Sequence, residues 1–210
     1  MILKHNNPCG AALADSPSDA FRKALDCDST SAFGGIVAFN NNVDLAAAEL
    51  LSNIFLECVV APSFDKDALE ILKNKKNLRL LQINNENINV DNKSVIKSIL
   101  GGVLEQDLDN EIDQLNEWSY ITETKPSTEE FNDLRFSWKI CKHVKSNAIV
   151  ISKNQQTIGI GAGQMNRVGA AKIALDAAKD SANGAVLASD GFFPFSDSVE
   201  IANKYGIKSI

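Results

Sequence analysis

Histidine is scarce in this 210-residue chain, which has only two, and its four cysteines include no Cys-x-x-Cys pair. Ligands so few and so scattered make a zinc site hard to build. They also give no disulfide framework, so we interpret the cysteines as reduced thiols of a cytoplasmic protein. No apolar run approaches the about 18 residues that a membrane-spanning helix needs. The first ten residues lack the apolar core of a signal peptide. We therefore expect no membrane partner.

Positive charge is in the minority, because 21 Lys and Arg residues stand against 27 Asp and Glu residues and the net charge is −6. A nucleic-acid-binding protein needs a basic face, so we expect no nucleic-acid partner. The composition is otherwise globular, with 44% hydrophobic and 23% charged residues, and a chain of this length can bury a substantial core.

Apolar runs alternate with helical patterns in the first half of the chain. Strands are predicted at 35–39, 58–61 and 78–83, and helices are predicted to start at Asp44 and Asp65. This alternation predicts an α/β fold with a largely parallel sheet. The asparagine-rich stretch 84–92 is predicted to be a loop.

The second half shows the same alternation. Ser127 and Glu130 form a capping box that predicts a helix to about Lys145, with an apolar stripe made by Phe131, Leu134, Trp138, Cys141 and Val144. Further elements are predicted as a hairpin of 148–152 and 157–160, a helix at 167–181, a strand at 185–189, a helix at 198–205 and the start of a strand at 207–210. We divide the chain into a first lobe at 1–95, a connecting segment at 96–126 and a second lobe at 127–210.

Two polar clusters in the first half could carry chemistry. Lys4 and His5 supply a cation beside a titrating base in a turn, although a solvated terminus would have the same composition. The segment 28–35 combines small hydroxyls with paired glycines, which let a backbone approach a ligand closely, and an ordinary turn would do the same. Glu57 at a strand start could accept ligand hydroxyls or simply be solvated.

The second half offers three further candidates. Asn147, between a helix and a strand, could hold a carbonyl oxygen or cap the backbone. The glycine-rich turn 159–164 does not match G-x-G-x-x-G, but N–H groups at a helix start suit a phosphate, which Arg167 could clamp. The aromatic loop 190–197 could wall a flat heterocycle or plug a hydrophobic gap. We interpret His143 as a cation at the end of a helix.

Six segments together resemble one family, in which they occur in the same order. They are K-H-N-N-P-C-G, D-S-T-S-A-F-G-G-I-V-A-F-N, V-V-A-P, K-S-N-A-I-V, I-G-I-G-A-G-Q-M-N-R and S-D-G-F-F-P-F-S-D. Over residues 3 to 197 the chain resembles the transformylase part of the AICAR transformylase/IMP cyclohydrolase family. The resemblance implies a step of purine biosynthesis, in which a formyl group passes from the co-substrate 10-formyltetrahydrofolate to the 5-amino group of the nucleotide AICAR. It also implies a homodimer of cytidine-deaminase-like α/β/α lobes without a zinc site.

The same resemblance assigns roles to individual residues. It makes Lys4, His5 and Asn147 catalytic. It places Glu57, Arg167, Phe192, Phe193, Pro194 and Asp197 against AICAR. It places Ser31, Phe33, Gly34 and Met165 near the folate, and it implies no metal ligand.

The chain departs from the family pattern in two ways that shape the expected activity. Family members have an upstream cyclohydrolase domain, and they continue past Ile210 into a tail whose histidine and arginine assist the site. We therefore expect a fragment that lacks cyclohydrolase activity and transfers formyl groups poorly. One alternative is a non-catalytic nucleotide- or folate-binding remnant. The other is a zinc deaminase-like hydrolase, which the missing H-x-E…P-C-x-x-C signature disfavours.

Overall fold

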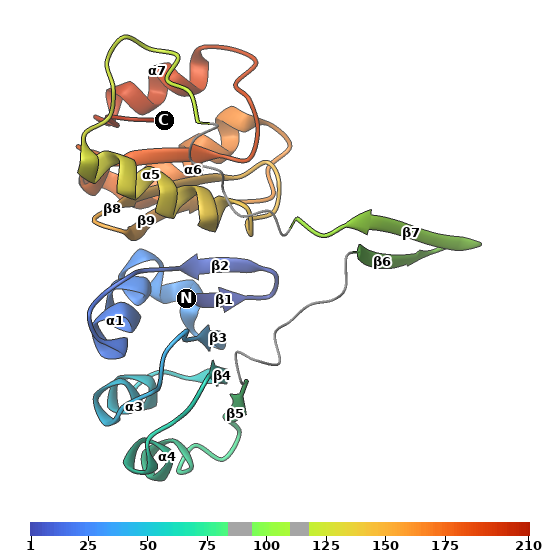
Figure 1. The fold of residues 1–210 in the computed structure, drawn as a ribbon, viewed down its shortest axis with the longest axis vertical. Coiled ribbons are helices and arrows are strands. Elements are labelled where there is room, and N and C mark those ends of the chain that lie inside the picture. The colour runs from blue at the N-terminus through green and yellow to red at the C-terminus, as the bar shows by residue number, and fades with distance from the viewer. Residues whose placement is uncertain (84–93, 110–117) are drawn as a thin grey trace. The chain divides into compact units, whose positions relative to one another are not determined.

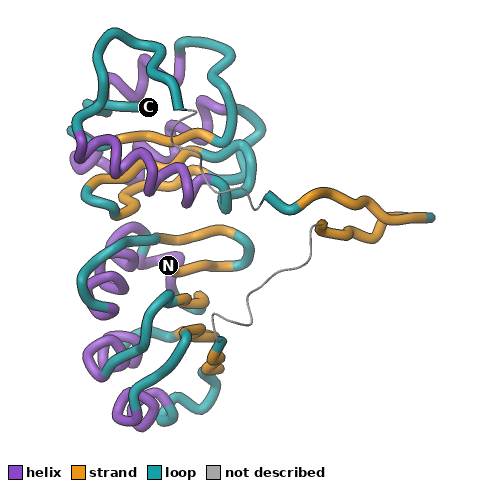
Figure 2. The backbone as a smooth tube through the Cα atoms, viewed as in Figure 1, coloured by secondary structure: helices purple, strands orange, loops and turns teal. Residues whose placement is uncertain are grey.

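The computed structural model describes residues 1–83, 94–109 and 118–210. It divides into two compact units, one formed by Met1–Gln82 with Pro126–Ile210 and the other by Ile83–Lys125 (Figures 1 and 2). The loop expected at 84–92 lies outside the described residues. No helix within the described ranges is both long and apolar enough to cross a membrane.

The first half of the larger unit is built on a five-stranded sheet with the order β2-β1-β3-β4-β5. Its strands are β1 (Ile2–Lys4), β2 (Asn7–Gly10), β3 (Gly35–Ala38), β4 (Leu56–Ala61) and β5 (Arg79–Gln82). The expected strands are confirmed, and β3, β4 and β5 run parallel. The sheet is only half parallel, however, because β1 runs antiparallel to both β2 and β3.

The hairpin of β1 and β2 argues against the alternative that the first residues are a solvated terminus. Met1 exchanges both main-chain hydrogen bonds with Ala38, each at 2.9 Å. Ile2 is fully buried beneath the hairpin. The alternating pattern that would reveal β1 is only three residues long, so the sequence showed a turn and not the two strands beside it.

Helices cover one face of this sheet, as Figure 1 shows for α1, α3 and α4. Their bounds are α1 (Pro17–Cys27), α2 (Ser29–Ala32), α3 (Leu45–Ser52) and α4 (Lys66–Leu72). Asp44 caps α3 as expected, since its carboxylate accepts from Ala47 N at 2.8 Å. Asp65 precedes α4 but makes no side-chain cap bond. The core between the layers consists mainly of Ile2, Phe21, Val37, Ala47, Leu51, Val59 and Leu72.

The second half of the larger unit is a three-layer arrangement around an antiparallel sheet with the order β10-β8-β9. Its elements are α5 (Thr128–Cys141), β8 (Ile149–Lys153), β9 (Gln156–Gly161), α6 (Arg167–Ala178), the 3-10 helix η3 (Lys179–Ala182), β10 (Val186–Ser189) and α7 (Asp197–Lys204). Helices α6 and α7 pack on one face of the sheet and α5 on the other. The strand expected at 207–210 is reduced to a single bridge between Val186 and Ser209.

Helix α5 has the predicted capping box at Ser127 and Glu130, but its buried stripe differs from the predicted one. Trp138 is 45% exposed. Cys141 and Val144 are buried as predicted, but the buried face also carries Asp133, Phe136, Ser137 and Ile140. Counting only apolar residues misplaced the stripe, because two polar residues lie on the buried face.

Asp133 shows why a polar residue lies on the buried face of α5. Its two carboxylate oxygens accept hydrogen bonds from the main-chain N–H groups of Asn154 (2.8 Å) and Gln155 (2.6 Å), in the turn between β8 and β9. Asn154 and Gln155 have φ values of 54° and 53°, a region in which side chains other than glycine are uncommon. The buried carboxylate thus satisfies the N–H groups of a tight turn that lacks glycine.

Gly159 and Gly161 of β9 lie directly beneath α6. A Cβ atom at either position would stand 2.0 Å from a helix carbonyl oxygen, that of Ala174 or Ala170. Glycine therefore allows the helix and the strand to approach closely. This packing is the reason for the glycines that the sequence suggested as a phosphate-binding turn, and Asn166 caps the helix start by accepting from Gly169 N at 2.7 Å.

The two sheets of the larger unit are joined where the chain leaves β2 and runs beside β9. Ala11 donates to the buried hydroxyl of Thr157 at 2.9 Å and accepts from Thr157 N at the same distance. Leu13 N donates to Gln155 O. These bonds satisfy main-chain groups that the junction buries.

The smaller unit contains the antiparallel hairpin of β6 (Ser94–Ile99) and β7 (Gly102–Asp107). These two strands were not predicted from the sequence. With the parallel strands of the larger unit, the described elements confirm the α/β class. The more specific likeness to cytidine-deaminase lobes, and the lobe boundaries at 95 and 126, remain predictions.

Candidate functional site

Lys4 and His5 lie where β1 turns into β2. His5 is exposed and has a φ of 54°, so the backbone turns sharply at the imidazole. The Lys4 ammonium donates to the main-chain oxygen of Phe33 at 2.7 Å. The hairpin that carries the two predicted catalytic residues is thereby tied to the loop that carries the predicted folate residues.

This loop presents an aromatic surface. The Phe33 ring is 59% exposed and lies 5.2 Å, centroid to centroid, from the ring of Phe55. Gly34 has a φ of 73° and donates its N–H to Phe55 O at 2.8 Å, so the turn holds the two rings together. Phe55 was missed from the sequence, although an aromatic residue just before a strand that bears a candidate carboxylate was a usable signal.

Two other predicted site residues, Ser31 and Glu57, form contacts with neighbouring residues. Ser31 lies in α2 and donates its main-chain N–H to Asp28 Oδ1 at 2.8 Å. Glu57 is not simply solvated, because its carboxylate pairs with Arg79 of the neighbouring strand at 2.7 Å. Both side chains of this pair are largely exposed, so the pair contributes little to stability, and a ligand could compete for either partner.

A hydrogen bond connects the hairpin of Lys4 and His5 to the segment that leads to Asn147. The side-chain oxygen of Asn7 accepts from Lys145 N at 2.9 Å. Asn7 stands two residues after His5, and Lys145 stands two residues before Asn147. The three predicted catalytic residues, of which Asn147 lies more than 140 residues after Lys4 and His5 in the sequence, therefore belong to one region of the folded chain.

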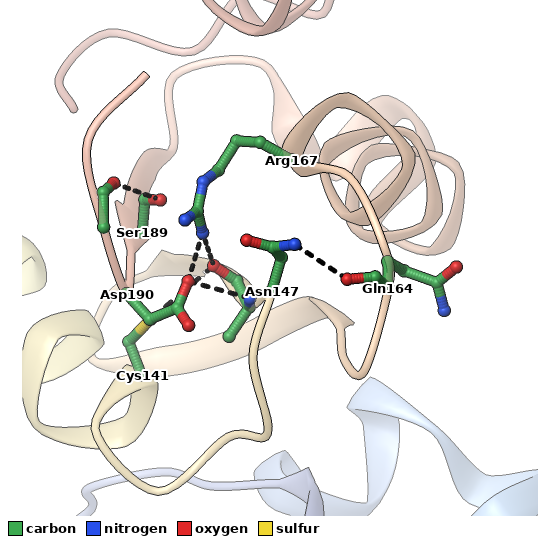
Figure 3. A network of polar contacts seen from close by, with 8 residues as sticks. Cys141, Asn147, Gln164, Arg167, Ser189 and Asp190 are labelled. Carbon is green, nitrogen blue, oxygen red and sulfur yellow. Dashed lines mark hydrogen bonds and ion pairs between the residues drawn. The ribbon is translucent and has the colours of Figure 1, made fainter. Parts of the chain in front are cut away.

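The orientation of the Asn147 amide is fixed by its partner. Its Nδ2 donates to the main-chain oxygen of Gln164 at 2.8 Å, and its main-chain N–H donates to the same oxygen at 3.1 Å. A carbonyl oxygen only accepts hydrogen bonds, so the atom facing it must be the nitrogen. Figure 3 shows the amide oxygen turned away from Gln164, on the side of Arg167. This oxygen and the second N–H of the amide remain for a ligand.

Arg167, the first residue of α6, forms an ion pair with Asp190, which follows β10 (Figure 3). The side chains are only 13% and 16% exposed. Burial tends to raise the pKa of the Asp190 carboxyl, but hydrogen bonds from Ser146, Ala148 and Arg167, with the charge of Arg167, outweigh it and hold that pKa below its usual range. Asp190 was not among the predicted site residues, although it is the second residue of the S-D-G-F-F-P-F-S-D motif.

In the aromatic loop after Asp190, one phenylalanine is packed and two are exposed. Phe193 packs against the core beneath α6, which agrees with a plug. Phe192 and Phe195 are 80% and 74% exposed, as a wall for a flat ligand requires. Pro194 and Asp197 are exposed, and Asp197 opens α7.

The remaining candidates are separate from these contacts. Met165 is 91% exposed, one residue before the cap of α6. His143 is exposed just beyond the end of α5. Across residues 1–83, 94–109 and 118–210, no three side chains of the metal-binding types cluster together.

Burial protects the thiols near the site, and we expect Cys141 to be modified slowly. Burial and the nearby Asp190 charge raise the pKa of Cys141 to about 12, and burial raises that of Cys27 to about 11. The reactive thiolate is therefore almost absent at pH 8. Ellman's reagent should label Cys141 at a small fraction of the rate measured in urea. Labelling of folded Cys141 as fast as that of a small free thiol would contradict this.

The chain is thus an α/β protein in which hydrogen bonds connect the hairpin of Lys4 and His5 to the turn of Phe33 and to the segment before Asn147. It belongs to the AICARFT/IMPCHase bienzyme family, whose sequence model matches residues 1–177. All 210 residues match the bifunctional purine biosynthesis protein PurH of Prochlorococcus marinus, at 63% identity in strain MIT 9515 and 64% in subsp. pastoris strain CCMP1986. The chain spans 41% of the length of each relative. The resemblance drawn from the six motifs is confirmed.

Proposed function

We propose that this chain acts in purine biosynthesis and carries the site that transfers the formyl group of 10-formyltetrahydrofolate to the 5-amino group of AICAR. The observation that carries the proposal is the hydrogen bond from Lys145 to Asn7, because it joins the hairpin of Lys4 and His5 to the segment of Asn147. Family membership supports the choice of reaction. The zinc deaminase-like alternative lacks a ligand set of the required type among the described residues.

The reaction requires two proton movements. The amine nitrogen of AICAR attacks the formyl carbon, and a C–N bond forms as the carbonyl becomes an oxyanion. This amine is a weak nucleophile because its lone pair is delocalised, so a base must remove its proton. When the oxyanion collapses, the bond to N10 of the folate breaks and N10 takes up a proton. The products are formyl-AICAR and tetrahydrofolate.

We assign the proton removal to His5 and the stabilisation of charge to Lys4. The imidazole is exposed at the tip of a sharp turn, and imidazole is the side chain most often used as a general base. The Lys4 ammonium has three donors and uses one on Phe33 O. The others can stabilise the oxyanion or supply a proton to N10. Asn147 holds the formyl oxygen with its second amide N–H.

The substrates would bind on either side of this centre. The Phe33 ring and the Gly34 turn suit the flat folate ring, with Ser31 and Met165 at its edges. In the second lobe, Arg167 suits an anionic group of the nucleotide, and the exposed aromatic loop suits its base. Glu57 and Asp197 are carboxylates that can accept its hydroxyl groups. We further propose that the protein is cytoplasmic and works as a homodimer.

The test is direct assay of the purified 210-residue chain with both substrates. We expect formyl-AICAR and tetrahydrofolate to accumulate in equal amounts by mass spectrometry. Calorimetric titration with AICAR and with a folate analogue gives a second readout. Binding of both without turnover would identify a non-catalytic remnant, and absence of both binding and turnover would overturn the proposed function.

A further inference from the structure

Asp190 contacts two elements of the proposed site at once. Its Oδ1 atom accepts from Arg167 Nη1 and from the main-chain N–H of Ala148, the latter at 2.9 Å. Arg167 is the first residue of α6, and Ala148 directly precedes β8. One largely buried carboxylate oxygen thus fixes a side chain and a backbone segment relative to each other.

The backbone held in this way is the one next to Asn147. The main-chain oxygen of Ala148 accepts from Asp190 N at 3.3 Å and from Arg167 Nη1 at 3.5 Å. Asn147 itself is bound on its other side to Gln164 O. Asn147 therefore lies between two anchors, one at Gln164 and one at Asp190 (Figure 3).

The loop around Asp190 also leaves space for the guanidinium. A Cβ atom on Gly191 would stand 2.8 Å from Arg167 Nη2. The guanidinium keeps donors beyond those used on Asp190, since arginine has five, and its buried Nε has no hydrogen-bond partner among the described residues.

We infer that Asp190 is a positioning residue that aligns Asn147 for the formyl group and Arg167 for the anionic part of the nucleotide. The inference rests on the proposed function for the identity of the two ligands. The alignment of the two side chains rests on the contacts alone. Asp190 does not need to touch either substrate in this role.

Two substitutions at Asp190 separate its contact with Arg167 from its contact with Ala148. Asp190→Asn keeps an oxygen that can accept from Ala148 N but removes the charge that pairs with Arg167. We expect AICAR to bind at least tenfold more weakly, with kcat changed by less than threefold. Asp190→Ala also releases Ala148, so kcat should fall a further tenfold or more. Asp19→Asn, which alters an exposed ion pair on α1, is the matched control and should change neither value.

A spectroscopic readout tests the alignment without turnover. In the 15N-labelled chain, the side-chain amide signals of Asn147 and the Nε–H signal of Arg167 should both shift in Asp190→Ala, although they belong to different elements. Gly191→Ala should shift the Arg167 signal and weaken AICAR binding while leaving the Asn147 signals in place. It meets only the end of a flexible side chain, so it should fold even if Asp190→Ala does not.

The experiments test the positioning role of Asp190 and the proposed function separately. Unchanged Asn147 and Arg167 signals in both Asp190 variants, with AICAR affinity within twofold of the unaltered chain, would overturn the positioning role. Absence of both substrate binding and formyl transfer in the unaltered chain, with the signal shifts present in Asp190→Ala, would overturn the proposed function and leave the alignment standing.

Discussion

His5→Ala is expected to slow formyl transfer by about 10²–10⁴-fold, the usual contribution of a general base. The reason is that the amine of AICAR cannot complete its attack while it keeps its proton, and His5 stands at the exposed turn beside Lys4. AICAR binding should change little, since the imidazole acts on the reacting nitrogen. Initial rates at saturating substrates, with the protein concentration raised to compensate for slow turnover, give the comparison.

The control for this prediction is His143→Ala. It removes the other histidine of the chain, which is exposed beyond the end of α5. Its circular dichroism and its rate should match those of the unaltered chain. The assignment of His5 fails if His143→Ala loses as much turnover while it folds normally.

Gly161→Ala is expected to destabilise the larger unit by several kcal/mol. The added methyl group would meet the Ala170 carbonyl oxygen of α6 at 2.0 Å, and rigid backbone cannot yield as a side chain would. Overpacking of a tight core usually costs about 1–3 kcal/mol and occasionally more, and a clash with helix backbone belongs at the upper end. The free energy of unfolding from urea titration, read from the midpoint at constant m-value, measures the loss.

Gly102→Ala provides the comparison at a glycine without neighbours. A Cβ atom there meets nothing within 4 Å, and the position lies in β7 of the smaller unit. The urea midpoint should therefore stay close to that of the unaltered chain. Equal midpoints for Gly161→Ala and Gly102→Ala would show that α6 can move away from β9 at little cost, and our account of the glycines would be wrong.

The two glycines of β9 show what the sequence alone could not distinguish. Gly159 and Gly161 were visible as a motif, but a phosphate-binding turn and a close helix–strand contact need the same residue type. Only the packing of α6 on β9 distinguishes the two. Asp133 is a similar case, because an acidic residue within a helix gives no sign that it faces a turn instead of solvent.

The sequence indicated separate segments of the candidate site but not the contacts between them, again because those contacts are tertiary. The motifs around Lys4, Phe33 and Asn147 drew attention to segments that hydrogen bonds connect in the folded chain, since turns with glycine and polar side chains are local features. Asp190 was passed over because its partners, Arg167 and Ala148, are distant along the chain. A carboxylate that binds through tertiary contacts looks like any surface carboxylate in a linear sequence.

By itself, the sequence determined the α/β class, the start of α5, the positions of most strands along the chain and the family to which the chain belongs. These follow from local periodicity, from capping residues and from the conjunction of six motifs, none of which requires knowledge of distant neighbours. Tertiary structure alone decided which face of α5 is buried, how β1 pairs with β3, and that Asn7 meets Lys145. The physical reason is that hydrogen bonds and close packing between distant segments depend on the three-dimensional path of the chain, and a buried polar group must find its partner there.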